Sequence, residues 1–165
     1  MQKVRTTLLL CMAAVVIGAL TCCAVLLWPA NAEAATASSQ TSVKVEKLAA
    51  GTKYETSLYI ISSGKPGPVV MVVGGIHGNE KAGYTAARKI TEYKITRGTL
   101  LVLPEANKLA IKANRRIAPG EIDLNRAFPQ SSTQKPKNTL SRAIYKAVKD
   151  YKVDWLIDLH EGYDY

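Results

Sequence analysis

Two short stretches of the sequence place histidine and carboxylate side chains directly after apolar runs. In "VVMVVGGIHGNEKAG", residues 69–83, His77 and Glu80 follow a run of mostly β-branched residues that ends in glycines. The other histidine of the chain, His160, follows a second apolar run, "DWLIDLH". Zinc in catalytic sites takes three protein ligands of the histidine and carboxylate kind and keeps a fourth position for water. These two stretches are therefore candidates for one metal site.

The elements that must position these residues read as an α/β fold. The runs "VVMVVGG" and "GTLLVLP" are continuously apolar, which is typical of strands covered on both faces. We expect further strands in "SVKVEKL", at an edge of the sheet, in "ETSLYIIS" and in "VDWLIDLH". Because helical patterns lie between the strands, the sequence predicts a mixed, mostly parallel sheet with helices on both faces.

Two of these helical patterns are long enough to predict which face is buried. The first runs from Glu80 to about Tyr93, with Ala82, Ala86, Ala87 and Ile90 on one side. The second is "NTLSRAIYKAVKDY", with Leu140, Ile144, Ala147, Val148 and Tyr151 on its apolar side.

In open α/β sheets, ligand sites form at the carboxyl ends of the strands. His77 and Glu80 follow one such end and His160 follows another, so the two histidines can meet at one edge of the sheet. Glycines 74, 75 and 78 would let the backbone bend and bring Glu80 beside His77. The alternative is that His77 caps a helix and that His160 is an ordinary half-buried histidine. Spacing alone leaves both interpretations open.

The stretch "IDLNRAFP", residues 122–129, wedges polar side chains among apolar ones. Taken alone it is typical of a surface turn with ordinary salt bridges. Beside a metal it suggests carboxylate recognition, because arginine binds a carboxylate through two parallel hydrogen bonds and asparagine adds another. Upstream, "KANRR" supplies Arg115 and Arg116, and a cation near a metal stabilises the oxyanion that forms when water attacks an amide.

Four ordered motifs, "GGIHGNE", "ANRR", "DLNRAFP" and "DLHEG", together resemble the zinc metallocarboxypeptidase superfamily. The wording "HGNE" points to its succinylglutamate desuccinylase/aspartoacylase-like branch. The resemblance covers roughly residues 67–162. It implies a zinc carboxypeptidase-like fold and an amide hydrolase that acts next to a substrate carboxylate.

The same resemblance implies roles for individual residues. Zinc would be bound by His77, Glu80 and His160, and Asp123 would orient a ligating histidine. Arg116 would polarise the scissile carbonyl, although Arg115 lies next to it and the choice between them stays open. Asn125 and Arg126 would hold the substrate carboxylate.

The chain departs from the family's pattern in one respect. These enzymes carry a second glutamate, the general base, on a strand well downstream of the third ligand. We therefore expect an incomplete catalytic domain that lacks its C-terminal strands and has little or no activity. Glu161 should point away from the metal, because adjacent strand residues face opposite sides. Asp158 shares the side of His160 but lies deeper in the strand.

The first 32 residues read as a signal peptide or an uncleaved membrane anchor. Lys3 and Arg5 precede an apolar stretch, and "ANA" and "AEA" fit the small-residue cleavage pattern. A small-residue linker, 33–42, leads to the domain at 43–165. We expect a secreted or cell-envelope protein that contacts the membrane only through residues 1–32, and only if that segment is not cleaved.

Charge and cysteine content bear on two further classes of function, nucleic-acid binding and thiolate chemistry. The formal net charge is +9 for the whole chain and +7 without the first 32 residues, which contain Lys3 and Arg5. The remaining basic residues are scattered and do not alternate with aromatic ones. This pattern gives no support for nucleic-acid binding. All three cysteines, Cys11, Cys22 and Cys23, lie in the first 32 residues, so thiolate chemistry is excluded from the domain.

Several substrates and two alternatives to an enzyme fit these observations. The "HGNE" motif favours N-acyl amino acids, whereas export favours small peptides or peptidoglycan stem peptides. The first alternative is a non-catalytic remnant that binds zinc and a carboxylate, and the second is a purely structural α/β domain without a metal. The sequence leaves the choice between peptides and N-acyl amino acids open.

Overall fold

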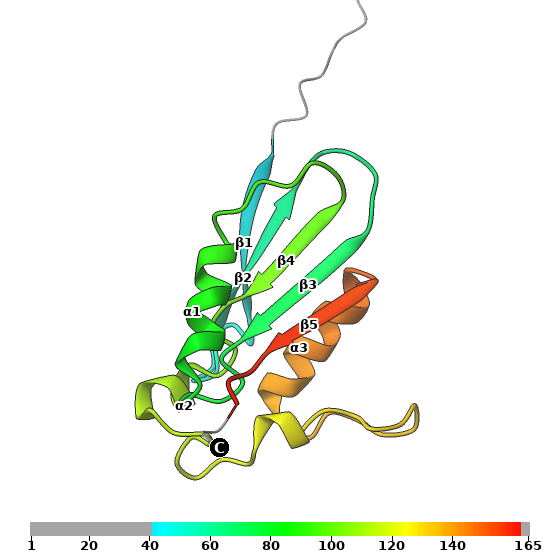
Figure 1. Cartoon of the computed structure of the whole chain (residues 1–165). Coiled ribbons are helices and arrows are strands. Elements are labelled where there is room, and N and C mark those ends of the chain that lie inside the picture. Colours follow the sequence, from blue (N-terminus) through cyan, green and yellow to red (C-terminus); the bar gives the residue numbers. More distant parts are fainter. Residues whose placement is uncertain (1–40, 163–165) are drawn as a thin grey trace, which may run out of the picture. The chain divides into compact units, whose positions relative to one another are not determined.

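The sheet of this protein has five strands in the order β1-β2-β4-β3-β5 (Figure 1). This arrangement comes from a computed structural model of the chain, in which residues 41–162 are described. The bounds are β1 Ser42–Leu48, β2 Thr56–Ser62, β3 Val69–Gly74, β4 Thr99–Leu103 and β5 Trp155–Leu159. β1 and β4 both pair antiparallel with β2, whereas β4 and β5 both pair parallel with β3. Every strand except β2 therefore runs in one direction, which confirms the predicted mixed, mostly parallel sheet.

The predicted signal or anchor at 1–32, and almost all of the linker at 33–42, lie outside the described residues. In the part of the chain that the structure covers, none of the helices has the length and apolarity needed to cross a bilayer.

Within the described residues, four helical segments accompany the sheet. They are α1 Lys81–Ile90, α2 Lys108–Ala113, the 3-10 turn η1 Leu124–Arg126 and α3 Thr139–Asp150. A capping box starts α3, because the Asn138 side chain accepts from the Ser141 amide and Ser141 Oγ accepts from the Asn138 amide. The sequence did not predict α2 or η1, which are too short to show helical periodicity.

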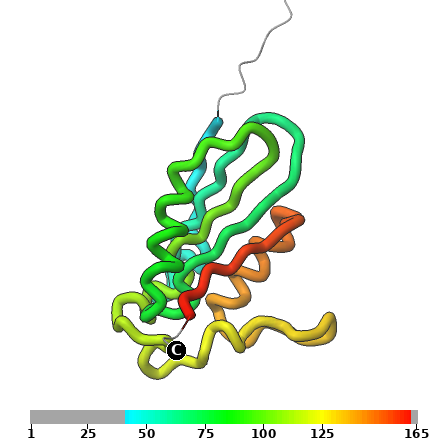
Figure 2. The backbone as a smooth tube through the Cα atoms, viewed as in Figure 1, coloured from blue at the N-terminus to red at the C-terminus, as the bar shows by residue number. Residues whose placement is uncertain are grey.

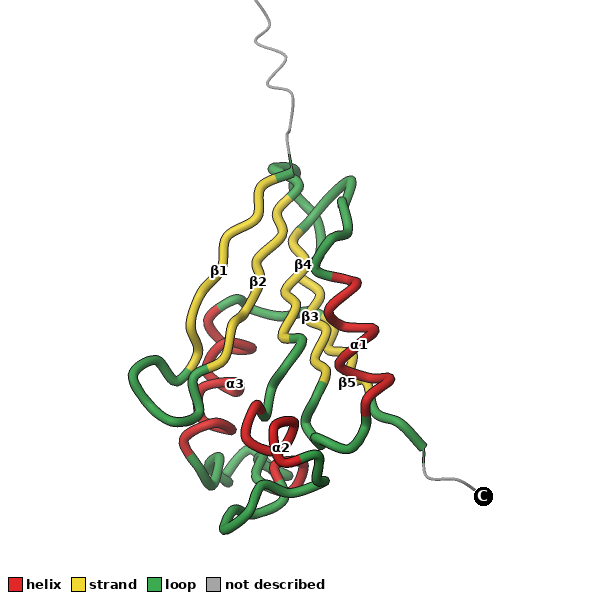
Figure 3. The backbone as a smooth tube through the Cα atoms, turned by 90° about the vertical axis from the view of Figure 1, so that its left-hand side faces the viewer, coloured by secondary structure: helices red, strands yellow, loops and turns green. Residues whose placement is uncertain are grey.

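Helices cover both faces of the sheet, as predicted. On one face α3 buries Leu140, Ile144 and Ala147 against residues that include Met71 and Leu101. On the other face α1 packs Ala87 against a cluster that holds Val72 and Val102. Figure 3 shows α1 and α3 on opposite sides of the strands.

The prediction for the buried face of α1 was right for Ala87 and Ile90, which pack on the sheet, but wrong for Ala82 and Ala86. Ala82 and Ala86 are exposed, and the face that meets the sheet carries Gly83, Tyr84 and Ala87. The reason is close backbone approach, because a Cβ atom on Gly83 would lie 2.4 Å from the carbonyl oxygen of Leu159. The helix turns its glycine, rather than its alanines, towards the end of β5.

The carboxyl ends of β3, β4 and β5 meet at one edge of the sheet. Gly74, the last residue of β3, lies beside Leu159, the last residue of β5, and Val73 lies beside Leu103 at the end of β4. In the tube view, the segment between α2 and α3 passes below this edge (Figure 2). Residues that follow β3 and β5 therefore emerge as neighbours.

Candidate metal centre

A glycine-containing loop carries His77 away from the end of β3. Gly75 has a φ of +75°, a left-handed conformation that favours glycine. Gly78 rests directly on α2, because a Cβ atom there would lie 2.0 Å from the carbonyl oxygen of Ala110. The Gly78 amide also donates to the Arg115 carbonyl at 2.9 Å. These contacts hold His77 over the sheet edge and let Glu80 turn back beside it, as the glycines predicted.

The imidazole of His77 is held between two carboxylates. Its Nδ1 lies 2.7 Å from Oε1 of Glu80, and its Nε2 lies 3.1 Å from Oδ1 of Asp123. The His77 side chain is only 1% exposed. His77 does not cap α1; Glu80 occupies that position and makes no side-chain capping hydrogen bond.

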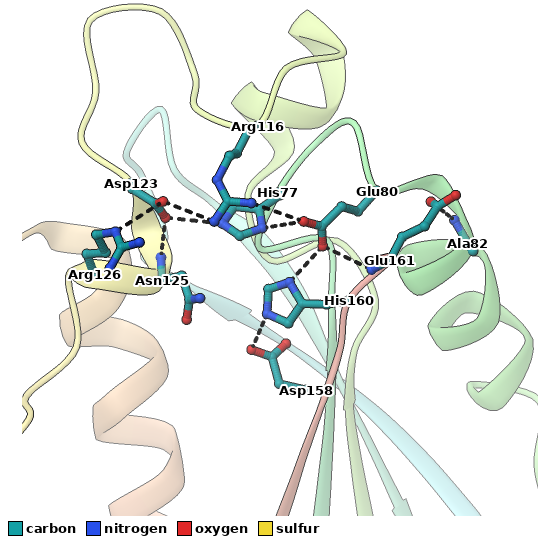
Figure 4. A network of polar contacts seen from close by, with 10 residues as sticks. All are labelled: His77, Glu80, Ala82, Arg116, Asp123, Asn125, Arg126, Asp158, His160 and Glu161. Atoms are coloured by element: carbon teal, nitrogen blue, oxygen red, sulfur yellow. Dashed lines mark hydrogen bonds and ion pairs between the residues drawn. The ribbon is translucent and has the colours of Figure 1, made fainter. Parts of the chain in front are cut away.

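The imidazole of His160 has the same two-sided arrangement. Its Nδ1 lies 2.7 Å from the other Glu80 oxygen, Oε2, and its Nε2 lies 2.9 Å from Oδ2 of Asp158. The Glu161 amide donates to Glu80 Oε2 at 3.2 Å. Both Nδ1 atoms therefore point at one carboxylate, and a further carboxylate stands behind each ring (Figure 4).

The three predicted ligands form a cluster of the size that a metal ion needs. One ligand atom from each of His77, Glu80 and His160 lies within 4.8 Å of the others. His77 and Glu80 are buried, whereas His160 opens towards solvent. The cluster thus has a closed side and an accessible side, the pattern of a site that admits a further ligand.

The electrostatics of the cluster favour the charged forms of Glu80 and His160. Burial alone would raise the pKa of Glu80, but hydrogen bonds from His160, the Glu161 amide and His77 outweigh it and lower this pKa. Burial opposes protonation of His160 as well, yet Glu80 and Asp158 outweigh it and raise the His160 pKa. Burial raises the pKa of Asp158. The site therefore attracts positive charge between its carboxylates.

Asp123 lies on the far side of His77 from Glu80. Burial alone would raise its pKa, but the contact with His77, the Asn125 amide and the charge of Arg116 outweigh burial and lower it. Asp123 also caps η1, since its Oδ1 accepts from the Asn125 amide at 2.9 Å. One carboxylate thus fixes both a histidine ring and the start of the turn that follows.

Of the two adjacent arginines, Arg116 is the one whose guanidinium reaches the cluster. It lies 3.5 Å from Glu80 and 3.3 Å from Asp123. Within the described residues, the hydrogen bonds of Arg115 are made by its backbone, to Gly78 and Ala110. The geometry therefore separates the two residues, which the sequence left open.

Asn125 and Arg126 lie on η1 beside Asp123. The Arg126 guanidinium is 3.8 Å from the Asp123 carboxylate and its side chain is 77% exposed. Figure 4 shows Asn125 and Arg126 on the same side of His77 as Asp123. Most of the Arg126 side chain is thus exposed and can reach an incoming anion.

Asp158 and Glu161, the carboxylates that flank His160 along the chain, are both engaged in other contacts and are not free to act as a base in this arrangement. The Glu161 side chain turns to α1, where its Oε2 accepts from the Ala82 amide at 3.0 Å. Asp158 is engaged with His160 Nε2. Both placements agree with the strand alternation of β5.

Sequence reasoning missed the bond between Asp158 and His160. The signal was present, because residues two apart on a strand share a face. The sequence places Asp158 on the side of His160, but the contact with the imidazole Nε2 depends on the orientation of the ring. The Glu161 amide contact with Glu80 had no signal in the sequence, since it depends on how the loop after β5 bends.

Comparisons with known proteins identify relatives of this chain. The curated relative N-alpha-acetyl-L-2,4-diaminobutyric acid deacetylase of Halomonas elongata is 32% identical over 104 residues, which are 58% of this chain and 29% of the relative. The chain thus spans less than a third of that protein.

Two solved structures share the fold. An aspartoacylase family protein from Mesorhizobium loti is 27% identical, with a TM-score of 0.59 over 73% of this chain and 40% of that one. A metallo-carboxypeptidase from Burkholderia cenocepacia is 16% identical, with a TM-score of 0.55 over 76% of this chain and 38% of that one. The second likeness shows the fold alone and supports the predicted carboxypeptidase-like architecture.

The family model of the succinylglutamate desuccinylase/aspartoacylase catalytic domain matches residues 66–164. This range includes every residue of the cluster. The match spans more than half of the chain and begins just before β3, the strand that leads to His77. The chain therefore belongs to the succinylglutamate desuccinylase/aspartoacylase family.

Proposed function

We propose that this protein is a zinc-dependent amide hydrolase domain of the deacylase type, which acts next to a substrate carboxylate. One observation carries the proposal. The Nδ1 atoms of His77 and His160 both face the carboxylate of Glu80 at 2.7 Å, while Nε2 of each ring faces another carboxylate.

The chemistry of these donors fits a bound cation. A neutral imidazole has one N–H, and a carboxylate accepts hydrogen bonds but donates none. Each ring lies between two carboxylates, so if Nε2 donates to Asp123 or Asp158, Nδ1 presents a lone pair to Glu80. Two acceptors at 2.7 Å repel each other unless a proton or a metal ion is shared between them.

Zinc is the metal we propose, because two histidines and a glutamate with a fourth position left for water are a known ligand set of catalytic zinc. His77, Glu80 and His160 would hold it. When bound, zinc lowers the pKa of a coordinated water and polarises a carbonyl group.

The protein's own side chains would divide the remaining tasks. Asp123 holds the His77 ring through Nε2. The Arg116 guanidinium, already beside two carboxylates, supplies positive charge where an amide oxygen gains negative charge. Arg126 and Asn125 would bind the substrate carboxylate, since the exposed guanidinium offers two parallel N–H groups.

N-acyl amino acids are the substrate class we favour. The Halomonas elongata relative is named for the deacetylation of an N-acetyl amino acid, and it shares 32% identity with this chain. Small peptides or peptidoglycan stem peptides are the second candidate, which rests on the predicted export of the chain through residues 1–32. We propose that this segment directs the protein to the cell envelope or the medium. Determining the N-terminal residue of the protein recovered from the producing cells tests that assignment.

Binding without efficient turnover is the alternative function, and one observation favours it. In residues 41–162, both carboxylates that flank His160 along the chain are engaged, Asp158 with the imidazole and Glu161 with α1. General-base help typically contributes a factor of about 10² to 10⁴. We therefore expect slow hydrolysis by these 165 residues, even with zinc bound.

The decisive experiment measures zinc content, ligand binding and turnover on the purified chain. We expect one zinc per chain, zinc-dependent binding of N-acetyl amino acids, and turnover far below that of a working deacylase. Absence of stoichiometric zinc would overturn the proposal. Efficient zinc-dependent turnover that persists in Glu161→Gln would instead refute the binding-only alternative.

A further inference from the structure

We propose that Asp158 is a positioning residue that fixes the His160 imidazole through Nε2, and so presents Nδ1 towards Glu80. Its role for His160 matches that of Asp123 for His77. The proposal rests on the proposed zinc site for its purpose, but its first test concerns the metal-free protein.

The register of β5 places Asp158 for this role. Asp158 lies beside Val73 in the sheet, and His160 follows just beyond the end of the strand. Two residues apart, their side chains share a face, and Asp158 Oδ2 lies 2.9 Å from His160 Nε2. Strand β5 therefore holds Asp158 rigidly, and Asp158 in turn supports the ring of His160, which lies beyond the paired residues of the sheet.

His160 needs such support more than His77 does. The His77 side chain is 1% exposed and is held by packing, whereas the His160 side chain is 32% exposed. An exposed ring with few packing contacts is free to rotate unless hydrogen bonds fix it. Within the described residues, its hydrogen-bonding partners are Glu80 on one nitrogen and Asp158 on the other.

The two carboxylates have opposite effects on where a neutral His160 ring carries its proton. Glu80 faces Nδ1 and favours the tautomer with a proton there, which blocks a metal ligand. Asp158 faces Nε2 and favours the other tautomer, which leaves Nδ1 free. Removing Asp158 therefore shifts the proton towards Nδ1.

The test compares Asp158→Ala, Asp158→Asn and the control Asp150→Ala in untagged protein labelled with ¹⁵N-histidine. Asp150 is an exposed residue of α3 that pairs with Lys146. At a pH where both rings are neutral, nitrogen NMR reports each tautomer, and a His77→Gln spectrum assigns the two rings. We expect the share of Nε2–H at His160 to fall in the order wild type, Asn, Ala, because the Asn amide oxygen still accepts a hydrogen bond.

Zinc affinity supplies the second readout. Loss of an outer partner of a ligating histidine weakens metal binding by about 10-fold to 100-fold. We expect this loss in Asp158→Ala, a smaller one in Asp158→Asn and none in Asp150→Ala. Unchanged His160 tautomers in both Asp158 variants would overturn the proposal, whatever the zinc affinity. If the wild type binds no zinc, the proposed function fails while the tautomer measurement still decides the role of Asp158.

Discussion

The imidazole rings of His77 and His160 lie with their centroids 4.9 Å apart and their planes tilted by 51°. One ring follows β3 and the other follows β5, two parallel strands whose last residues are partners in the sheet. The parallel register therefore brings the two histidines together, and Glu80 lies between their Nδ1 atoms.

His77→Ala and His160→Ala are each expected to reduce zinc binding from one ion per chain to a small fraction. Each variant leaves two donors where a stable site needs three. The measurement is metal analysis after dialysis against a weak chelator, together with a competition titration. Glu80→Gln should behave like the histidine variants, and Glu92→Gln, at an exposed position beyond α1, serves as its matched control. Equal zinc content in all of these proteins would contradict the site.

Arg126→Ala is expected to weaken binding of N-acetyl amino acids to the zinc-loaded chain by about 10-fold to 100-fold, the value of hydrogen bonds to a charged group. Amidated analogues, which lack the carboxylate, should bind wild type and variant equally. Calorimetric titration of both ligands measures the difference. Because the Arg126 side chain is 77% exposed, removing it should leave the fold intact. Arg142→Ala, on the exposed surface of α3, is the control. An equal loss for both ligands would make Arg126 structural.

Gly78→Ala is expected to destabilise the protein by about 1–3 kcal/mol, the usual cost of overpacking. A Cβ atom would lie 2.0 Å from backbone atoms of Ala110, so the loop that carries His77 must move away from α2. Zinc affinity should fall with stability. Denaturant unfolding and chelator competition measure the two effects. Gly162→Ala, where an added Cβ meets nothing within 4 Å, should change neither.

Glu121→Gln is expected to remove a pH-dependent part of the stability. Hydrogen bonds from Lys53 and Tyr54 lower the pKa of Glu121 from its ordinary value of 4.5. Because the pKa is lower in the folded state, this contribution is complete above the unfolded pKa and disappears as the pH falls through the folded pKa. Denaturant unfolding should show a difference of less than about 1 kcal/mol at neutral pH. The difference should shrink in acid, and a difference that grows in acid would contradict the assignment.

The sequence predicted all five strands of the described chain and both longer helices, because each carries an apolar run or a recognisable apolar periodicity. It also predicted that His77, Glu80 and His160 would meet, since that follows from the ends of parallel strands. It did not predict the strand order, which places β4 between β2 and β3 and depends on long-range pairing. The buried face of α1 was predicted only in part, because the close contact of Gly83 with Leu159 turns Ala82 and Ala86 towards solvent. Asp158 was seen on the correct face, but its partner atom required the ring orientation.

The strand β5 forms an exposed, apolar edge of the sheet. Within residues 41–162, β5 pairs with β3 on one side and has no strand on the other. Its Trp155, Leu156 and Ile157 side chains are 69%, 50% and 48% exposed. An apolar strand with an unpaired edge is a template for pairing with another chain.

Trp155→Lys is therefore expected to raise the monomer fraction and slow the aggregation of the chain. A charge on an edge strand opposes edge-to-edge pairing. The fold should tolerate the change, because substitution at so exposed a position usually alters stability by no more than about 0.5 kcal/mol. Size-exclusion chromatography and light scattering over a range of concentrations make the comparison. Tyr93→Lys adds the same charge at a side chain that is 59% exposed but lies on no strand. If both variants improve solubility equally, net charge is the cause; if only Trp155→Lys does so, the edge of β5 is the route of association.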